Sequence, residues 1–140
     1  MKVLLHCLLM ALLIFTPVNA SNLEQGIKAF DAGSYQLAYA YWLPMAEKDH
    51  AEAQLFLGVL YRYGLGVEKD PVRSAYWYER AANNGDVDAQ GEMGFLYEQG
   101  YGVPKDIWIA ESWYDLVQQH DMCVSDTLPT GRLVVEESLK

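Results

Sequence analysis

The sequence predicts an all-α protein of about three helix pairs that follow a leader peptide. The main observation is an internal repeat: residues 53–70 and 89–106 carry the same pattern, and the second copy starts 36 residues after the first. Within each copy, apolar residues recur at the 3.6-residue period of an amphipathic helix. Each copy then contains a Gly-x-Gly turn followed by an Asp. Periods of this length are typical of helical repeat proteins.

The first 20 residues have the pattern of a secretory signal peptide. Lys2 precedes an apolar run over residues 3–15, and the segment 18–20 ends in Ala20. The run is shorter than the roughly 20 residues that a membrane-spanning helix needs, so we expect cleavage after Ala20. An uncleaved anchor is the alternative. The mature chain is therefore expected to be periplasmic or secreted and to have no membrane span.

Residues 21–50 are expected to form a leading, shortened helix pair. Helices are predicted over 23–32 and 35–48, and a Gly-Ser dipeptide connects them. Pro44 lies inside the second helix, where it lacks an N–H donor and should kink the helix or split its last turn.

Residues 51–85 form the first complete repeat, and its first helix is predicted over 51–63. One face of this helix is expected to be buried. That face consists of Ala53, Leu57, Leu60 and Tyr61. Gly64 and Gly66 follow the helix, because glycine tolerates the left-handed backbone geometry that ends a helix.

The second helix of this repeat is predicted to start after Asp70. Its carboxylate can accept hydrogen bonds from the first free N–H groups of a helix, and Pro71 suits the first helical position. The buried stripe of this helix is predicted to consist of Ser74, Trp77, Tyr78, Ala81 and Ala82. The Asn-Asn-Gly segment 83–85 ends it.

Residues 86–121 are expected to form a second complete repeat. Its helices are predicted over 87–99 and 107–120, and Asp106 stands where Asp70 stands in the first repeat. We expect the glycine inside the first helix of each repeat to allow two helices to approach closely, since it otherwise lowers helix stability by about 1 kcal/mol relative to alanine. The aromatic side chains predicted to fill the space around Gly58 and Gly94 are Trp77 and Trp113, or Tyr61 and Tyr97.

Together these residues resemble the Sel-one-like repeat over about 35–121. In the first copy the matching structural positions are Gly58, Tyr61, Gly64, Gly66, Asp70 and Trp77. In the second copy they are Gly94, Tyr97, Gly100, Gly102, Asp106 and Trp113. The resemblance implies a short right-handed αα-solenoid, related to the tetratricopeptide repeat.

Proteins of this family are similar in serving as adaptors that hold other proteins, so the resemblance implies an exported module that binds a partner protein through its concave face. Candidate partner-binding residues lie off the buried stripe of each first helix. They are Phe56, Val59, Tyr63, Glu92, Phe95 and Gln99. The alternative is that neighbouring helices or the C-terminal tail cover them. We expect the protein to be a monomer.

Two other functions stay open on the sequence. One is an immunity or inhibitor protein that neutralises a periplasmic toxin. The other is a structural component of an envelope or motor complex. Nucleic acid is not an expected partner, because 19 acidic against 10 basic residues give the chain a net charge of −9, which repels phosphate backbones.

No catalytic residue, metal site or cofactor is predicted. His50 and His120 each lie at a helix end and lack neighbours at metal-ligand spacing. Helix capping accounts for the acidic residues predicted at helix starts, namely Asp49, Asp70, Asp86 and Asp106. A β-lactamase-like hydrolase is the least favoured alternative, since the cysteine-rich relatives reported to be β-lactamases resemble chains with a cysteine pair in each repeat. The mature chain has Cys123 alone.

Residues 122–140 are interpreted as a C-terminal tail or cap, with Cys123 at the start of an irregular segment. Because the end of a stack of repeats needs a cap, we expect the tail to fold back over helix 107–120 and bury part of Trp108 or Trp113. A free tail, or one ordered by a partner, is the alternative.

Overall fold

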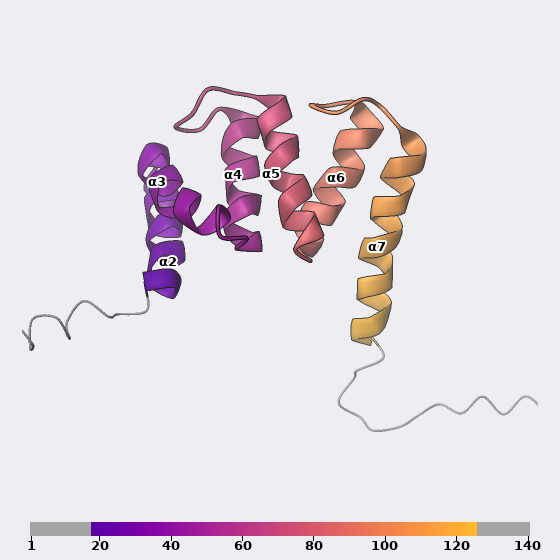
Figure 1. Ribbon diagram of the computed structural model, residues 1–140, viewed down its shortest axis with the longest axis horizontal. Helices are drawn as coiled ribbons and strands as arrows, with labels where there is room; N and C mark the ends of the chain where they lie inside the picture. Colours follow the sequence, from indigo (N-terminus) through magenta and orange to yellow (C-terminus); the bar gives the residue numbers. More distant parts are fainter. Residues whose placement is uncertain (1–17, 126–140) are drawn as a thin grey trace, which may run out of the picture.

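The computed structural model describes residues 18–125, and within this range the chain forms α-helices and no β-strand (Figure 1). The helices are α2 (Val18–Asp31), α3 (Tyr35–Ala46), α4 (Ala51–Tyr63), α5 (Pro71–Asn83), α6 (Val87–Gln99) and α7 (Ile107–Ser125). The apolar run of the expected leader lies outside the described residues. No helix within them is both long enough and apolar enough to span a bilayer.

The helices pack in chain order as three pairs, α2 with α3, α4 with α5, and α6 with α7. Neighbouring pairs meet where α3 packs on α4 and where α5 packs on α6. Figure 1 shows the resulting row, with α2 and α3 at one end and α7 at the other. The predicted all-α solenoid of three helix pairs is confirmed.

Within the two complete repeats, helices begin and end at the turns that the sequence predicts. Glycines with left-handed backbone geometry end α4 and α6, and aspartate side chains cap the first turns of α5 and α7. Gly64 and Gly100 cap the C-terminal ends of α4 and α6 in the left-handed region, with φ of 70° and 71°. One carboxylate oxygen of Asp70 accepts hydrogen bonds from two backbone N–H groups in the first turn of α5, each at 3.0 Å. Asp106 accepts the equivalent pair in the first turn of α7.

The expectation that Asp49 caps α4 is wrong. His50 is the N-cap, and its Nδ1 accepts a hydrogen bond from the N–H of Ala53 at 3.4 Å. Asp49 instead has a φ of 62°, and its carboxylate accepts hydrogen bonds from Gln54 and from Arg80. It therefore connects the residues just before α4 to the last turn of α5, the second helix of the same pair.

The apolar stripes predicted for α4 and α5 are buried, and they belong to two separate clusters. The first cluster joins α2, α3 and α4 and includes Trp42, Leu57 and Leu60 together with Trp77 from α5. The second joins α5 to α6 and includes Tyr78, with Met93 and Leu96 from α6. Trp113 and Tyr97 are half-buried at the edge of the second cluster.

The rings that fill the space beside Gly58 and Gly94 are not those expected. A Cβ atom at Gly58 would lie 2.6 Å from the ring of Tyr78, and the ring of Tyr114 blocks Gly94 in the same way. Trp42 blocks Gly26 in the leading repeat. Tyr78 follows Trp77 directly in the sequence, and a helix turns by about 100° per residue, so periodicity alone does not decide which of the two rings points at the glycine.

A glutamine clamps each first helix to the end of the preceding second helix. Nε2 of the fully buried Gln54 donates to the carbonyl oxygen of Ala46 at 2.8 Å. Gln90, 36 residues later, donates to the carbonyl oxygen of Ala82 at 3.3 Å. The clamp satisfies carbonyl groups that the end of a helix leaves without an intrahelical partner.

The second glycine of each Gly-x-Gly turn rests on the preceding repeat. A Cβ atom at Gly66 would lie 2.5–2.8 Å from atoms of Tyr35 and Gln36 at the start of α3. A Cβ atom at Gly102 would likewise meet the backbone of Pro71 at the start of α5. These turns therefore hold successive repeats together as well as ending helices.

The helix ends differ from the predicted bounds at both ends of the row. α2 begins at Val18 rather than at residue 23, and α3 ends at Ala46, two residues after Pro44. α7 continues to Ser125, so Cys123 lies in a helix and not at the start of an irregular tail. The chain has no Gly or Pro between residues 104 and 129 that would end α7 earlier. The expected return of the tail over α7 lies outside the described residues.

Candidate partner-binding groove

An open groove of about 660 Å³ crosses three helices of the solenoid. Its lining residues come from α4, from most of one face of α6, and from α7. They are Arg62, Val87, Asp88, Gly91, Glu92, Phe95 and Val117. Nothing lies within 4 Å of a Cβ atom built at Gly91, so this part of the groove is open down to the backbone of α6.

Arg62 organises the groove from α4. Its guanidinium forms an ion pair with Glu92 on α6 and lies 4.8 Å from the centre of the Phe95 ring and 5.5 Å from that of the Tyr63 ring. Burial alone lowers the pKa of Arg62, but the charge of Glu92 and the hydroxyl of Tyr78 outweigh it, so the pKa is raised and the cation is retained. A cation at these distances attracts both aromatic rings.

The structure brings some of the candidate partner-binding residues together in this groove. Glu92 and Phe95 line it, and Phe95 is 38% exposed. Tyr63 adjoins it through Arg62 and is 61% exposed. Gln99 is exposed at the end of α6, outside the lining.

The other two candidates are half-buried in the core. Phe56 stacks on Trp42 with ring centres 4.5 Å apart, and it packs against the first cluster. Val59 packs against the second cluster. Neighbouring helices cover both side chains in part, as the alternative interpretation of the sequence expects.

Five lining residues are not among the candidates given by the sequence, namely Arg62, Val87, Asp88, Gly91 and Val117. Arg62 is the most important of them, because it pairs with Glu92. Its equivalent 36 residues later is Glu98, and the equivalent of Phe56 is Glu92. The pattern shared by both repeats does not require these charges, so the difference between the repeats is a signal that could have drawn attention to both positions, although it does not show that Arg62 and Glu92 pair. The hydroxyl of Tyr101 also donates to the carbonyl oxygen of Arg62 at 3.3 Å, which ties the following turn to the groove.

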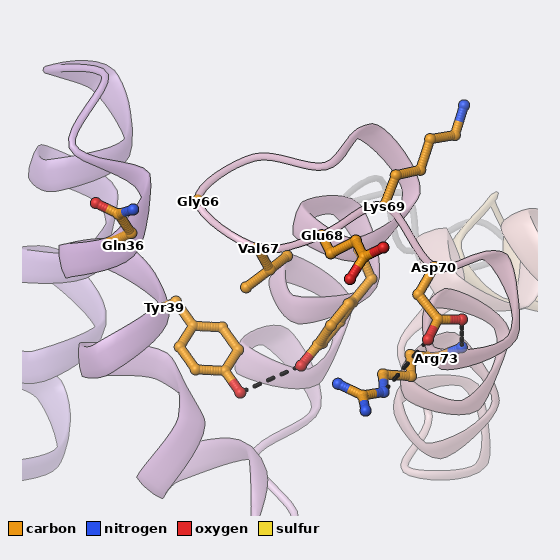
Figure 2. A pocket seen from close by; sticks show the side chains of 9 residues that line it. Gln36, Tyr39, Gly66, Val67, Glu68, Lys69, Asp70 and Arg73 are labelled. Carbon is orange, nitrogen blue, oxygen red and sulfur yellow. Dashed lines mark hydrogen bonds and ion pairs between the residues drawn. The ribbon is translucent and has the colours of Figure 1, made fainter.

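A second hollow of about 480 Å³ lies between the first two repeats, where the turn 64–70 faces α3 (Figure 2). The hydroxyl groups of Tyr39 and Tyr61 lie 3.2 Å apart. Figure 2 shows the hydroxyl of Tyr39 and the guanidinium of Arg73 turned toward each other across this cleft. The hydrogen bond with Tyr61, followed by burial, raises the pKa of Tyr39 to about 12, so the phenol is neutral at physiological pH.

The polar lining of this cleft is specific to the first junction. At the second junction, the positions of Gln36, Tyr39 and Arg73 are held by Val72, Ala75 and Ile109. Arg73 is already paired with Asp70, with Nε 3.3 Å from a carboxylate oxygen. Since the Arg73 cation is paired with a carboxylate of the same wall, we assign the cleft to the packing of the turn on α3.

Among residues 18–125, no group of three or more His, Cys, Asp or Glu side chains is arranged to hold a metal ion.

The fold and the groove define a helical repeat protein of the αα-solenoid class. The family model described as Sel1 repeat matches residues 23–50, 51–86 and 87–116. The chain belongs to the Sel1 repeat family, which confirms the resemblance given by the sequence motifs.

Solved structures support the same assignment. A Sel1 repeat protein from Oxalobacter formigenes is 33% identical, over 69% of this chain and 40% of that chain, with a TM-score of 0.65. The protein c5321, a protective antigen present in uropathogenic Escherichia coli strains and displaying an SLR fold, is 29% identical over 73% of this chain and 23% of that chain, with a TM-score of 0.70. This chain thus spans less than half the length of either protein.

Helicobacter pylori cysteine rich protein B shares the fold, with 22% identity, a TM-score of 0.61, and coverage of 79% of this chain and 98% of that chain. No curated protein matches the chain.

Proposed function

We propose that this chain is an exported, non-catalytic interaction module that binds another protein in the groove formed by α4, α6 and α7. Sel1 repeat proteins are generally protein-interaction modules. The proposal adds to this the location of the contact surface and the compartment. The partner is a protein in the periplasm or outside the cell.

The observation that carries the proposal is the pair of exposed aromatic rings held by Arg62. Phe95 and Tyr63 are exposed to 38% and 61%, although both are large enough to be core residues. Aromatic and Arg side chains are enriched among the residues that dominate binding energy at protein interfaces. The Arg62 cation attracts both rings, which reduces the side-chain entropy that is lost when a partner covers them.

Export rests on the sequence of residues 1–20, with the leader expected to be removed after Ala20. Cell fractionation and N-terminal sequencing of the mature protein test it. A mature chain that begins at Ser21 supports the proposal, and a chain retained in the cytoplasm with its first residues intact contradicts it.

Photo-crosslinking in the native host tests the groove. Benzoylphenylalanine is placed at Phe95, at Tyr63 or at Gln99, and crosslinked proteins are identified by mass spectrometry. Tyr76 of α5 is the matched control, because it is an aromatic residue that is 51% exposed and lies outside the groove. We expect one partner to be captured from the groove positions and not from Tyr76.

Equal capture at Tyr76 and at the groove positions would contradict the assignment of the surface. The double substitution of Phe95 and Tyr63 by alanine provides the complementary test, since it should weaken binding of the captured protein by at least tenfold, which is about 1.4 kcal/mol. Circular dichroism checks that the variant retains its helices.

A further inference from the structure

The outer face of α7 carries three exposed apolar side chains. Trp108 is 80% exposed, Leu116 44% and Ile109 39%. Their spacing of seven and eight residues places them on one stripe of the helix, which we call the outer stripe of α7. Figure 1 shows α7 at the end of the row, and among the described helices it packs against α6.

The first complete repeat carries charged residues at two of the positions that are apolar in the outer stripe of α7. Arg73 and Arg80 of α5 stand 36 residues before Ile109 and Leu116. Both arginines form ion pairs with carboxylates. In α7 the aliphatic side chains of Ile109 and Leu116 take the places of these two arginines, and the exposed indole of Trp108 lies next to them. Covering such a stripe is favourable, because it removes apolar surface from water.

A further repeat, or a second copy stacked end to end, does not fit this stripe. In α5, the side that receives α6 has the buried residues Ala75 and Ala82. The equivalent residues of α7 are Glu111 and Gln118, and both are exposed. A stacked helix would bury the charge of Glu111, which costs several kcal/mol when no partner is supplied. It would also leave the outer stripe, on a different side of α7, uncovered.

The segment that follows α7 has the length and composition to cover the stripe. The distance along α7 from Ser125 back to Trp108 is about 26 Å at 1.5 Å per residue. Residues 126–140 span up to about 50 Å when extended. The Leu-Pro-Thr-Gly sequence at 128–131 is turn-like, and the nine residues after it reach about 30 Å.

These nine residues also carry the right pattern. In an extended segment alternate side chains share one side, and Leu133, Val135 and Leu139 fall on the same side, together with Glu137. We propose that residues 126–140 fold back along α7 and bury the outer stripe, so that the chain supplies its own C-terminal cap.

Quenching of tryptophan fluorescence by acrylamide tests this proposal. Of the tryptophans in the described residues, Trp42 and Trp77 are buried and Trp113 is half-buried, so the signal of Trp108 is isolated by subtracting the Trp108→Phe variant. We expect the quenching constant of Trp108 to rise roughly twofold when the chain is truncated after Ser125, because the indole loses its apolar cover. An equal constant in the full and truncated chains overturns the proposal.

Truncation could itself affect folding, so two full-length variants test the same contact in the complete chain. Leu133→Asp places a charge on the side of the segment that faces the stripe and is expected to raise the Trp108 quenching constant. Val134→Asp lies on the other side and is the control, with no change expected. An equal effect of both variants, or of neither, contradicts the proposed contact.

Dilution distinguishes the chain's own segment from a second copy of the protein as the group that covers Trp108. Protection of Trp108 by the chain's own segment is independent of protein concentration, and we expect the same quenching constant across a hundredfold dilution. Protection that disappears on dilution, together with a dimer in analytical ultracentrifugation, overturns the proposal.

Discussion

The ring of Tyr78 lies against the backbone of Gly58, so closely that a Cβ atom at this glycine would be 2.6–2.9 Å from three ring carbons. Tyr78 is 1% exposed and belongs to the second core cluster, so the ring has no free space into which it can move. Ser74, one turn earlier on α5, donates a hydrogen bond to the carbonyl oxygen of Gly58 at 2.9 Å. The two helices of the repeat are therefore in register at this glycine.

Gly58→Ala is expected to destabilise the protein by about 1–3 kcal/mol, because the added methyl group overpacks the contact with Tyr78. Gly91→Ala is the matched control, since Gly91 is also inside a helix and has open space around it. That variant should gain about 0.5–1 kcal/mol from higher helix propensity. Urea unfolding followed by circular dichroism measures both, and equal midpoints for Gly58→Ala and the unsubstituted chain would contradict the account.

Gln54→Leu should cost about 1–3 kcal/mol, because it removes the buried amide that donates to the carbonyl oxygen of Ala46 and leaves that oxygen with the N–H of Asp49 as its donor. The amide of Asn84, which donates to Oε1 of Gln54 at 2.8 Å, also loses its acceptor. Gln90→Leu is expected to cost less, since Gln90 is only half-buried and its bond is longer. Thermal unfolding of the two variants compares them, and a larger loss for Gln90→Leu would disprove this ranking.

Gly66→Ala and Gly33→Ala separate backbone strain from a steric clash. Both glycines have positive φ, 68° and 74°, so alanine at either position costs about 1–2 kcal/mol. Only Gly66 touches the neighbouring repeat, where an added Cβ would meet the backbone of Tyr35 and Gln36. We expect Gly66→Ala to lower the melting temperature clearly more than Gly33→Ala, and a similar change in both would show that the turn does not hold the junction.

Asp49 is expected to make stability depend on pH in the acidic range. The hydrogen bond with Arg80, together with that from Gln54, holds the pKa of the Asp49 carboxyl below its ordinary value. A carboxyl with a lowered pKa in the folded state stabilises the protein above its unfolded-state pKa, about 3.9, and this contribution is lost as the pH falls through the lowered folded-state value.

Asp49→Asn keeps a residue type that tolerates positive φ and removes the charge. The decrease in unfolding free energy below pH 4 should be smaller in this variant, and Arg80→Ala should reduce it in the same way. Urea titrations across the acidic range measure the slope. An unchanged slope in both variants would show that the ion pair contributes nothing.

Local sequence features predicted the fold well because this fold is built from neighbouring elements. Gly64 and Asp70 are residue types that favour helix termini, so they predicted where α4 ends and where α5 begins. Helical periodicity predicted the buried stripes. The equivalence of Gly26 to Gly58 was not predicted, because the turn of the leading repeat is shorter than the turn 64–70 and the 36-residue offset therefore does not align the two glycines. The contact of Gly26 with Trp42 spans 16 residues where that of Gly58 with Tyr78 spans 20.

The groove was only partly predictable, for a different reason. The sequence shows which side chains lie off the core stripe, and this selected Phe95 and Tyr63. It does not show how far a neighbouring helix overlaps that side, so Phe56 was selected together with them although it stacks on Trp42. The pairing of Arg62 with Glu92 joins two helices that are not consecutive, and no local pattern encodes it.

Trp77 and Tyr78 are adjacent in the chain, yet one belongs to the first core cluster and the other to the second. Helix α5 is therefore a shared wall between two otherwise separate interiors. A rotation of this helix about its own axis would repack both interiors at once, in opposite senses. The ion pair between Arg62 and Glu92 joins α4 to α6 directly, so a force applied at one end of the molecule reaches the other end through α5 and through this pair.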